Sequence, residues 1–212
     1  MIYGDSPEQG YARGSEFLHP VRQLAFRVPD GFSLRNMPDK VAAVSERNVL
    51  ILFDQEADRV TLPPGRYIAE DWARGRNLTN LQTGTVNGMN AATAHTTIDT
   101  SSERLLARVA AIHYGGGRVY RFLAVAPGGA SAPLDSAFRH TVSSFRRLTA
   151  AEAASLQPWR IRIVSVQPGD TIQGLARRMP FENFETERFE ILNGLGGGRT
   201  LVAGTRVKLV AE

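Results

Sequence analysis

The chain has 212 residues and no cysteine, and its 25 basic and 21 acidic residues give a formal net charge of +4 at pH 7. A content of 42% apolar and 22% charged residues is ordinary for a globular protein with a hydrophobic core. The lack of cysteine excludes disulfides and thiol catalysis, and the scattered arginines do not form the clustered basic surface of a nucleic-acid-binding protein.

Short strands are predicted in the first quarter of the chain, after a connecting segment. Residues 1–19 contain several glycines and prolines and are predicted to connect rather than to form a long helix. Residues 24–28 alternate apolar and polar side chains, as a half-buried strand does. Residues 41–45 and 49–53 are predicted to form a hairpin, and a helix is predicted to begin at Pro64 because proline fits the first helical position.

Two longer hairpins are predicted in the middle of the chain. Asn87 and Gly88 tolerate the positive φ angles of a tight turn, so they are predicted to join two strands. Three glycines at 115–117 mark a second such turn. A helix is predicted from Leu134, because the apolar residues after it recur at helical spacing. Residues 20–150 are therefore predicted to be an α+β domain, an antiparallel sheet with about two covering helices.

A second, smaller domain is predicted over residues 159–212, after an alanine-rich segment that ends in proline. Its pattern predicts the order strand, helix, helix, strand. Four of its pieces resemble the LysM domain: QPGDT at 167–171, the helix with Leu175 and Ala176, FEILNGL at 189–195 and AGTRVKL at 203–209. This resemblance implies that a small LysM-like βααβ module follows the sheet domain.

The LysM resemblance also implies a function, because such modules commonly bind the N-acetylglucosamine backbone of peptidoglycan or chitin. The groove would lie between the first turn and the end of the second helix. It would be formed by Gly169, Asp170, Thr171, Ile172, Asn193, Gly194 and Leu195. An alternative remains open, in which the same module is used only for packing against other protein surfaces.

No catalytic or metal-binding motif is found in the sequence, so no catalytic residue, metal ligand or cofactor is predicted. The His-Glu-x-x-His motif of zinc peptidases is absent, and His95 and His113 fall too far apart along their strands to share a metal. Ser136, His140 and Ser144 share a polar helix face, where solvent contact is the simpler interpretation. No apolar run is long enough for a membrane span, and the first residues lack a signal peptide.

The N-terminal segment carries a second resemblance. Residues 3–20, leading into LAFRVPDGF at 24–32, look like the part that follows the catalytic domain in exported bacterial zinc metallopeptidases of the HtpX-like and CAAX-prenyl-protease-like class. The resemblance implies a non-catalytic C-terminal region, derived from such a peptidase, that positions substrate, a partner or the cell wall. Its implied partners are an upstream peptidase domain, the protein substrates of that domain, or peptidoglycan, in the periplasm or cell envelope. A stand-alone peptidoglycan-binding LysM protein is the alternative, and an enzyme with an unrecognised site comes third.

Overall fold

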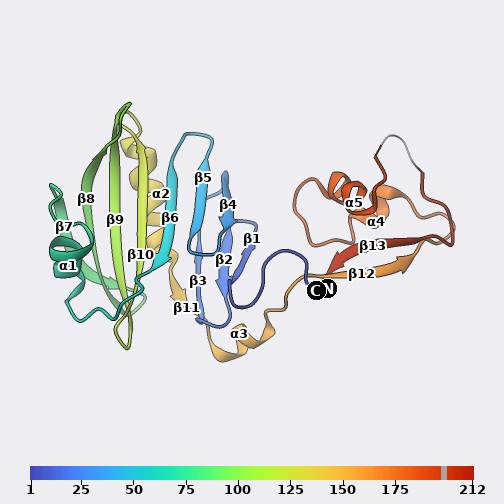
Figure 1. Cartoon of the computed structure of the whole chain (residues 1–212), viewed down its shortest axis with the longest axis horizontal. Helices are drawn as coiled ribbons and strands as arrows, with labels where there is room; N and C mark the ends of the chain where they lie inside the picture. The colour runs from blue at the N-terminus through green and yellow to red at the C-terminus, as the bar shows by residue number, and fades with distance from the viewer. Residues whose placement is uncertain (197–199) are drawn as a thin grey trace. The chain divides into compact units, whose positions relative to one another are not determined.

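The computed structural model describes residues 1–196 and 200–212. The chain divides into two compact units (Figure 1). The larger unit is Glu8–Ala153, and the smaller unit combines Met1–Pro7 with Ala154–Glu212. Among the described residues, no helix is both long and apolar enough to cross a membrane.

The larger unit contains two antiparallel sheets. The seven-stranded sheet has the order β4-β5-β6-β10-β9-β8-β7, and its strands are Phe32–Asn36 (β4), Val41–Ser45 (β5), Leu50–Gln55 (β6), Thr79–Val86 (β7), Met89–Asp99 (β8), Arg104–Gly115 (β9) and Arg118–Pro127 (β10). The four-stranded sheet has the order β1-β2-β3-β11, and its strands are Tyr11–Arg13 (β1), Glu16–His19 (β2), Leu24–Arg27 (β3) and Arg146–Arg147 (β11).

Helix α2 (Ser131–Ser144) packs on β3, β9 and β10 and completes the main core. Alternate residues of β10 are buried in this core, which explains why an alternating sequence forms a strand here. Three aromatic rings from three strands meet at its centre. The Phe53 ring lies 4.7 Å from that of Phe26 and 4.9 Å from that of Phe122, between centroids. Such aromatic contacts stabilise a core beyond the burial of their area.

The opposite face of the seven-stranded sheet is covered in part by a short helical segment. It comprises α1 (Pro64–Tyr67) and the π-helical turn η1 (Ile68–Trp72), which contact β8 and β9. Tyr67 and Ile68 are fully buried in a second, smaller core. Pro64 occupies the start of α1, where its missing N–H is not needed.

The smaller unit is organised around a two-stranded antiparallel sheet of β12 (Arg160–Ser165) and β13 (Arg206–Ala211). Helices α4 (Ile172–Ala176) and α5 (Glu185–Asn193) pack together, and their buried residues share one core with β13. In the sequence, α3 (Ala150–Ser155) precedes β12. The N-terminal residues also belong to this unit, since the Tyr3 N–H donates to the Trp159 carbonyl at 2.7 Å.

The predicted fold class is wrong. Among the described residues the chain has thirteen strands in three sheets and few helices, not one sheet with two covering helices followed by a LysM-like βααβ module. Residues 11–19, expected to connect, form β1 and β2 of a separate sheet. The smaller unit also includes Met1–Pro7, whereas the predicted module did not. Strands of two to four residues are too short for an alternation pattern to reveal them.

Candidate functional site

Hydrogen bonds to its own side chains hold the first predicted glycan loop in its conformation. Asp170 Oδ2 accepts the Gln167 N–H at 2.7 Å, and Thr171 Oγ1 accepts the Gly174 N–H at 3.0 Å as the N-cap of α4. Gly169 has a φ of +89°, a conformation that glycine adopts without strain. The backbone of Gly169 is exposed, and these contacts account for why the sequence has these residues at this turn.

The second predicted glycan loop is also used by the fold. The Asn193 amide makes three hydrogen bonds: Nδ2 donates to the carbonyls of Phe189 and Lys208, and Oδ1 accepts the Lys208 N–H. Gly194 ends α5 in the left-handed conformation. Leu195 packs against the small core, as Ile172 of the first loop does. The amide of Asn193 is therefore committed to holding α5 on β13.

A cavity of about 700 Å³ lies elsewhere in the smaller unit, along the outer side of α5. It is lined by Tyr3, Phe184, Glu187, Arg188, Ile191 and Leu192, which we call the α5 groove. Tyr3 comes from the N-terminal segment, and the other residues come from α5 and the residue that caps it. The groove thus joins parts of the chain that are far apart in sequence.

The α5 groove exposes two large apolar side chains. Phe184 is 67% exposed and Ile191 is 81% exposed, although α5 already buries Phe189 on its other side. Phe184 and Ile191 are seven residues apart, which is two helical turns, so they lie on one face of the helix. Arg188 lies between them, and its guanidinium is 4.7 Å from the Phe181 ring centroid.

Phe184 has a strained backbone. Its φ is +58° and its ψ is +34°, in the left-handed region that bulky residues avoid. Asparagine or glycine would occupy this cap without that strain, and the exposed ring gains little from burial. Strained residues of this kind are concentrated at functional sites. The fold keeps an aromatic ring here at a cost in stability.

Sequence reasoning missed the α5 groove. The seven-residue spacing of Phe184 and Ile191, beside a separate buried set around Phe189, was the signal that could have revealed a second apolar face. Tyr3 carried no such signal, because only the fold brings the N-terminus to α5.

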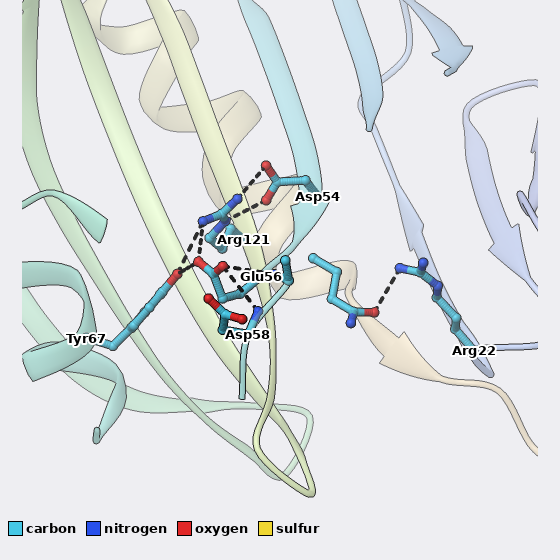
Figure 2. Close-up of polar contacts among 8 residues, drawn as sticks. Arg22, Asp54, Glu56, Asp58, Tyr67 and Arg121 are labelled. Atoms are coloured by element: carbon cyan, nitrogen blue, oxygen red, sulfur yellow. Dashed lines mark hydrogen bonds and ion pairs between the residues drawn. The ribbon is translucent and has the colours of Figure 1, made fainter. Parts of the chain in front are cut away.

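A cluster of polar side chains lies in the larger unit (Figure 2). Arg121 Nε and Nη2 donate to the two oxygens of Asp54 at 2.6 and 2.9 Å, and Nη1 donates to Glu56 Oε2 at 2.6 Å. The Tyr67 hydroxyl donates to the same Glu56 oxygen at 2.5 Å. The Trp72 ring centroid lies 5.3 Å from the Arg121 guanidinium carbon. We call these five residues the Arg121 cluster.

The hydrogen bonds and ion pairs of the Arg121 cluster link the helical segment of α1 and η1 to the sheet. Asp54 lies on β6 and Glu56 follows it, Arg121 lies on β10, and Tyr67 ends α1. The hydrogen bond from Tyr67 lowers the pKa of Glu56, while burial, assisted by the Glu56 carboxylate, raises the pKa of Tyr67. Both effects favour one fixed arrangement, an ionised Glu56 and a protonated Tyr67. The charged groups satisfy one another, as a structural ion pair requires.

The two histidines that the sequence analysis weighed for a shared metal are not brought together. His95 lies opposite Arg108 and His113 lies opposite Val119 in the register of the sheet, so the two histidines occupy separate places. Within residues 1–196 and 200–212, no group of three or more histidine and acidic side chains is arranged to hold a metal ion.

No protein-family model matches the chain, and no curated protein matches it. Among solved structures, a protein from Bacteroides thetaiotaomicron has 8% identity and a TM-score of 0.49, over 71% of this chain and 53% of that one. This chain therefore spans about half the length of that protein. Cyanobacterial PsbP from Synechocystis sp. PCC 6803 has 14% identity and a TM-score of 0.45, over 68% of this chain and 98% of that one. LpqN of Mycobacterium tuberculosis, involved in cell envelope biogenesis, has 12% identity and a TM-score of 0.44, over 69% of this chain and 88% of that one. At these scores the likenesses assign no function to this chain.

Proposed function

We propose that this chain is a non-catalytic region that holds unfolded polypeptide for an exported zinc metallopeptidase in the periplasm or cell envelope. The peptidase class comes from the sequence resemblance over residues 3–32. The observation that carries the binding role is the α5 groove, with Phe184 and Ile191 exposed around a cavity of about 700 Å³. Clefts of this volume that are lined by apolar and aromatic side chains are common binding sites.

The lining of the α5 groove fits an apolar side chain of a polypeptide. Ile191 and Leu192 offer aliphatic surface, and the rings of Tyr3 and Phe184 add aromatic surface. Aromatic and arginine residues are enriched among the anchors of protein interfaces. Arg188 and Glu187 can hydrogen-bond the backbone of the bound chain on either side of the anchor. Unfolded chains expose apolar side chains, so a groove with this lining fits unfolded polypeptide.

The experiment measures binding of fluorescently labelled casein, an unfolded protein, to the full chain by anisotropy. Ile191→Ser should weaken binding at least about fivefold, because one buried aliphatic side chain contributes more than 1 kcal/mol. Ile163→Ser is the matched control, since Ile163 is 65% exposed in the same unit but does not line the groove. Equal loss in both variants, or no binding by the unmodified chain, would reject the proposal.

Peptidoglycan binding at the two predicted loops is a second candidate. It is supported by the open backbone at Gly169 and Gly194, where a Cβ atom would meet nothing within 4 Å, so a sugar can approach closely. Titration of the full chain with N-acetylglucosamine oligomers, followed by amide chemical shifts, tests it. Saturable shifts confined to residues 169–172 and 193–195 would favour this candidate, and shifts at α5 alone would favour the groove.

A further inference from the structure

Strand β7 forms one edge of the seven-stranded sheet (Figure 1). It pairs with β8 along one side, and the order of the sheet ends there. Its residues, TNLQTGTV from 79 to 86, are exposed except for the half-buried Val86. An edge strand presents backbone N–H and C=O groups to which another extended chain can bind.

Native sheets usually protect such an edge with charge, proline, a bulge or a covering segment. β7 contains no charged residue and no proline. Its pairing is irregular between Thr79 and Gln82, where Asn80 has a φ of +50°, but the register from Gln82 to Val86 is regular. The C-terminal part of β7 is therefore a regularly paired, uncharged edge.

The other edge of the same sheet is protected. β4 carries Arg35, and the Asn36 amide donates to the carbonyls of Gln9 and Gly10 beside β1. β1 also packs against β4. The difference between the two edges singles out β7 as the place where an added strand can pair.

We propose that β7 binds an extended polypeptide by antiparallel strand addition, and that the bound segment has an uncharged, β-branched centre with acidic residues at its C-terminal end. Backbone hydrogen bonds provide affinity in this mode of recognition. The proposal is independent of the α5 groove, because it uses residues of the other unit and would hold if α5 bound nothing.

The charge preference follows from two exposed arginines. Arg74 and Arg76 lie in the turn directly before β7. In an antiparallel pair, the C-terminal end of the bound segment points toward the N-terminal end of β7, and therefore toward these arginines. Acidic residues there meet these arginines, of which Arg76 also acts on the Asp99 carboxylate at the end of β8, whereas a lysine would be repelled. A second copy of this chain is the weaker occupant, because pairing through one strand buries less than the roughly 1,200 Å² that a stable protein interface needs.

The test is an amide NMR titration of the full chain with a synthetic peptide of alternating threonine and valine that ends in two aspartates. We expect saturable shifts centred on residues 79–86. The same peptide with alternate amides N-methylated should bind at least about tenfold more weakly, because it lacks the N–H donors of the added strand. Equal binding of the methylated peptide, or shifts outside the β7–β8 region, would overturn the proposal. Shifts of β7 that depend on protein concentration without peptide would identify a second copy as the occupant and overturn it too.

The arginine contribution has its own matched pair of variants. Arg76→Gln should weaken binding of the aspartate-ended peptide about two- to fivefold at low salt, as the loss of an exposed ion pair does. Arg139→Gln removes an exposed arginine of α2 and should leave binding unchanged. A lysine-ended peptide should bind more weakly than the aspartate-ended one. If Arg76→Gln has no effect or both peptides bind alike, the acidic preference is wrong.

Discussion

The side-chain amide of Asn193 on α5 makes two hydrogen bonds to the backbone of Lys208 on β13, one as donor and one as acceptor. Its Oδ1 accepts the Lys208 N–H at 2.7 Å, and its Nδ2 donates to the Lys208 carbonyl at 3.0 Å. The amide thus replaces a neighbouring strand at this point of β13. This contact explains why asparagine stands at the end of α5 without any reference to a ligand.

These two hydrogen bonds predict that Asn193→Ala destabilises the smaller unit by about 1–3 kcal/mol, because the change leaves backbone groups of β13 without partners. Gln173→Ala, at an exposed position of α4, should change stability by less than about 0.5 kcal/mol. Urea unfolding followed by Trp159 fluorescence in a Trp72→Phe background reports on this unit. A stable Asn193→Ala protein would show that the amide is free to serve a ligand.

The Arg121 cluster predicts strong coupling between Tyr67 and Glu56. Tyr67→Phe should cost about 1.5–3 kcal/mol, since it removes a hydrogen bond to a charged group. Adding Glu56→Gln should cost less than the sum of the two single changes, with a coupling of at least about 0.5 kcal/mol. A double-mutant cycle in a Trp159→Phe background, read through Trp72, measures it. Additive effects would mean that the hydroxyl and the carboxylate act independently.

The same cluster has a defined pH dependence. The pKa of Glu56 is lower in the fold than in the unfolded chain, so its contribution to stability is present above the usual carboxylate range. That contribution is lost as the pH falls through the lowered pKa. The Glu56→Gln variant should therefore lose less stability on acidification than the unmodified chain. Unfolding curves at a series of acidic pH values provide the comparison.

A second loss of stability, at a higher pH than that of Glu56, is expected from His19. The side chain is 4% exposed, and burial together with the Arg22 cation lowers its pKa from 6.5 to about 4. The unfolded chain takes up this proton below about pH 6.5, whereas the fold resists it until about pH 4. Stability is therefore complete above pH 6.5 and falls by about 3 kcal/mol on the way to pH 4.

His19→Asn isolates this effect. Asparagine cannot titrate, yet its Oδ1 can replace His19 Nδ1 as acceptor of the Arg22 N–H at 3.2 Å. The variant should show a flatter loss of stability between pH 6.5 and pH 4 than the unmodified chain. Parallel curves for the two proteins would show that His19 is protonated in the fold throughout this range.

Turn chemistry made several elements of the larger unit predictable from the sequence. Asn87 and Gly88 both have positive φ angles, as their turn between β7 and β8 requires, and the glycines at 115–117 do the same between β9 and β10. Helix α2 also forms where its apolar periodicity predicts it. Turns and helical periodicity depend on residues that are close in the sequence, so they can be predicted without knowing the fold.

The division into sheets and the position of the candidate site could not be predicted in the same way. β1 has three residues and β11 has two, so their pairing depends on partners far away in sequence. Tyr3 reaches the α5 groove only because the N-terminus pairs beside β12. The role of Asn193 was equally hidden, because its partner Lys208 lies fifteen residues later in the sequence.

The strained cap of α5 gives the most discriminating prediction, because it separates function from stability. Phe184→Asn should stabilise the smaller unit by about 1 kcal/mol, since asparagine accepts the left-handed conformation that phenylalanine resists. The same change should weaken casein binding, because it removes the aromatic ring from the groove. Phe184→Ala is the matched control: it removes the ring but keeps a side chain that resists a positive φ, so binding should fall without a gain in stability. Urea unfolding read through Trp159 in the Trp72→Phe background and casein anisotropy, measured on the same variants, give both quantities. A loss of stability in Phe184→Asn would show that the ring packs in the fold, and unchanged binding in both variants would remove Phe184 from the proposed site.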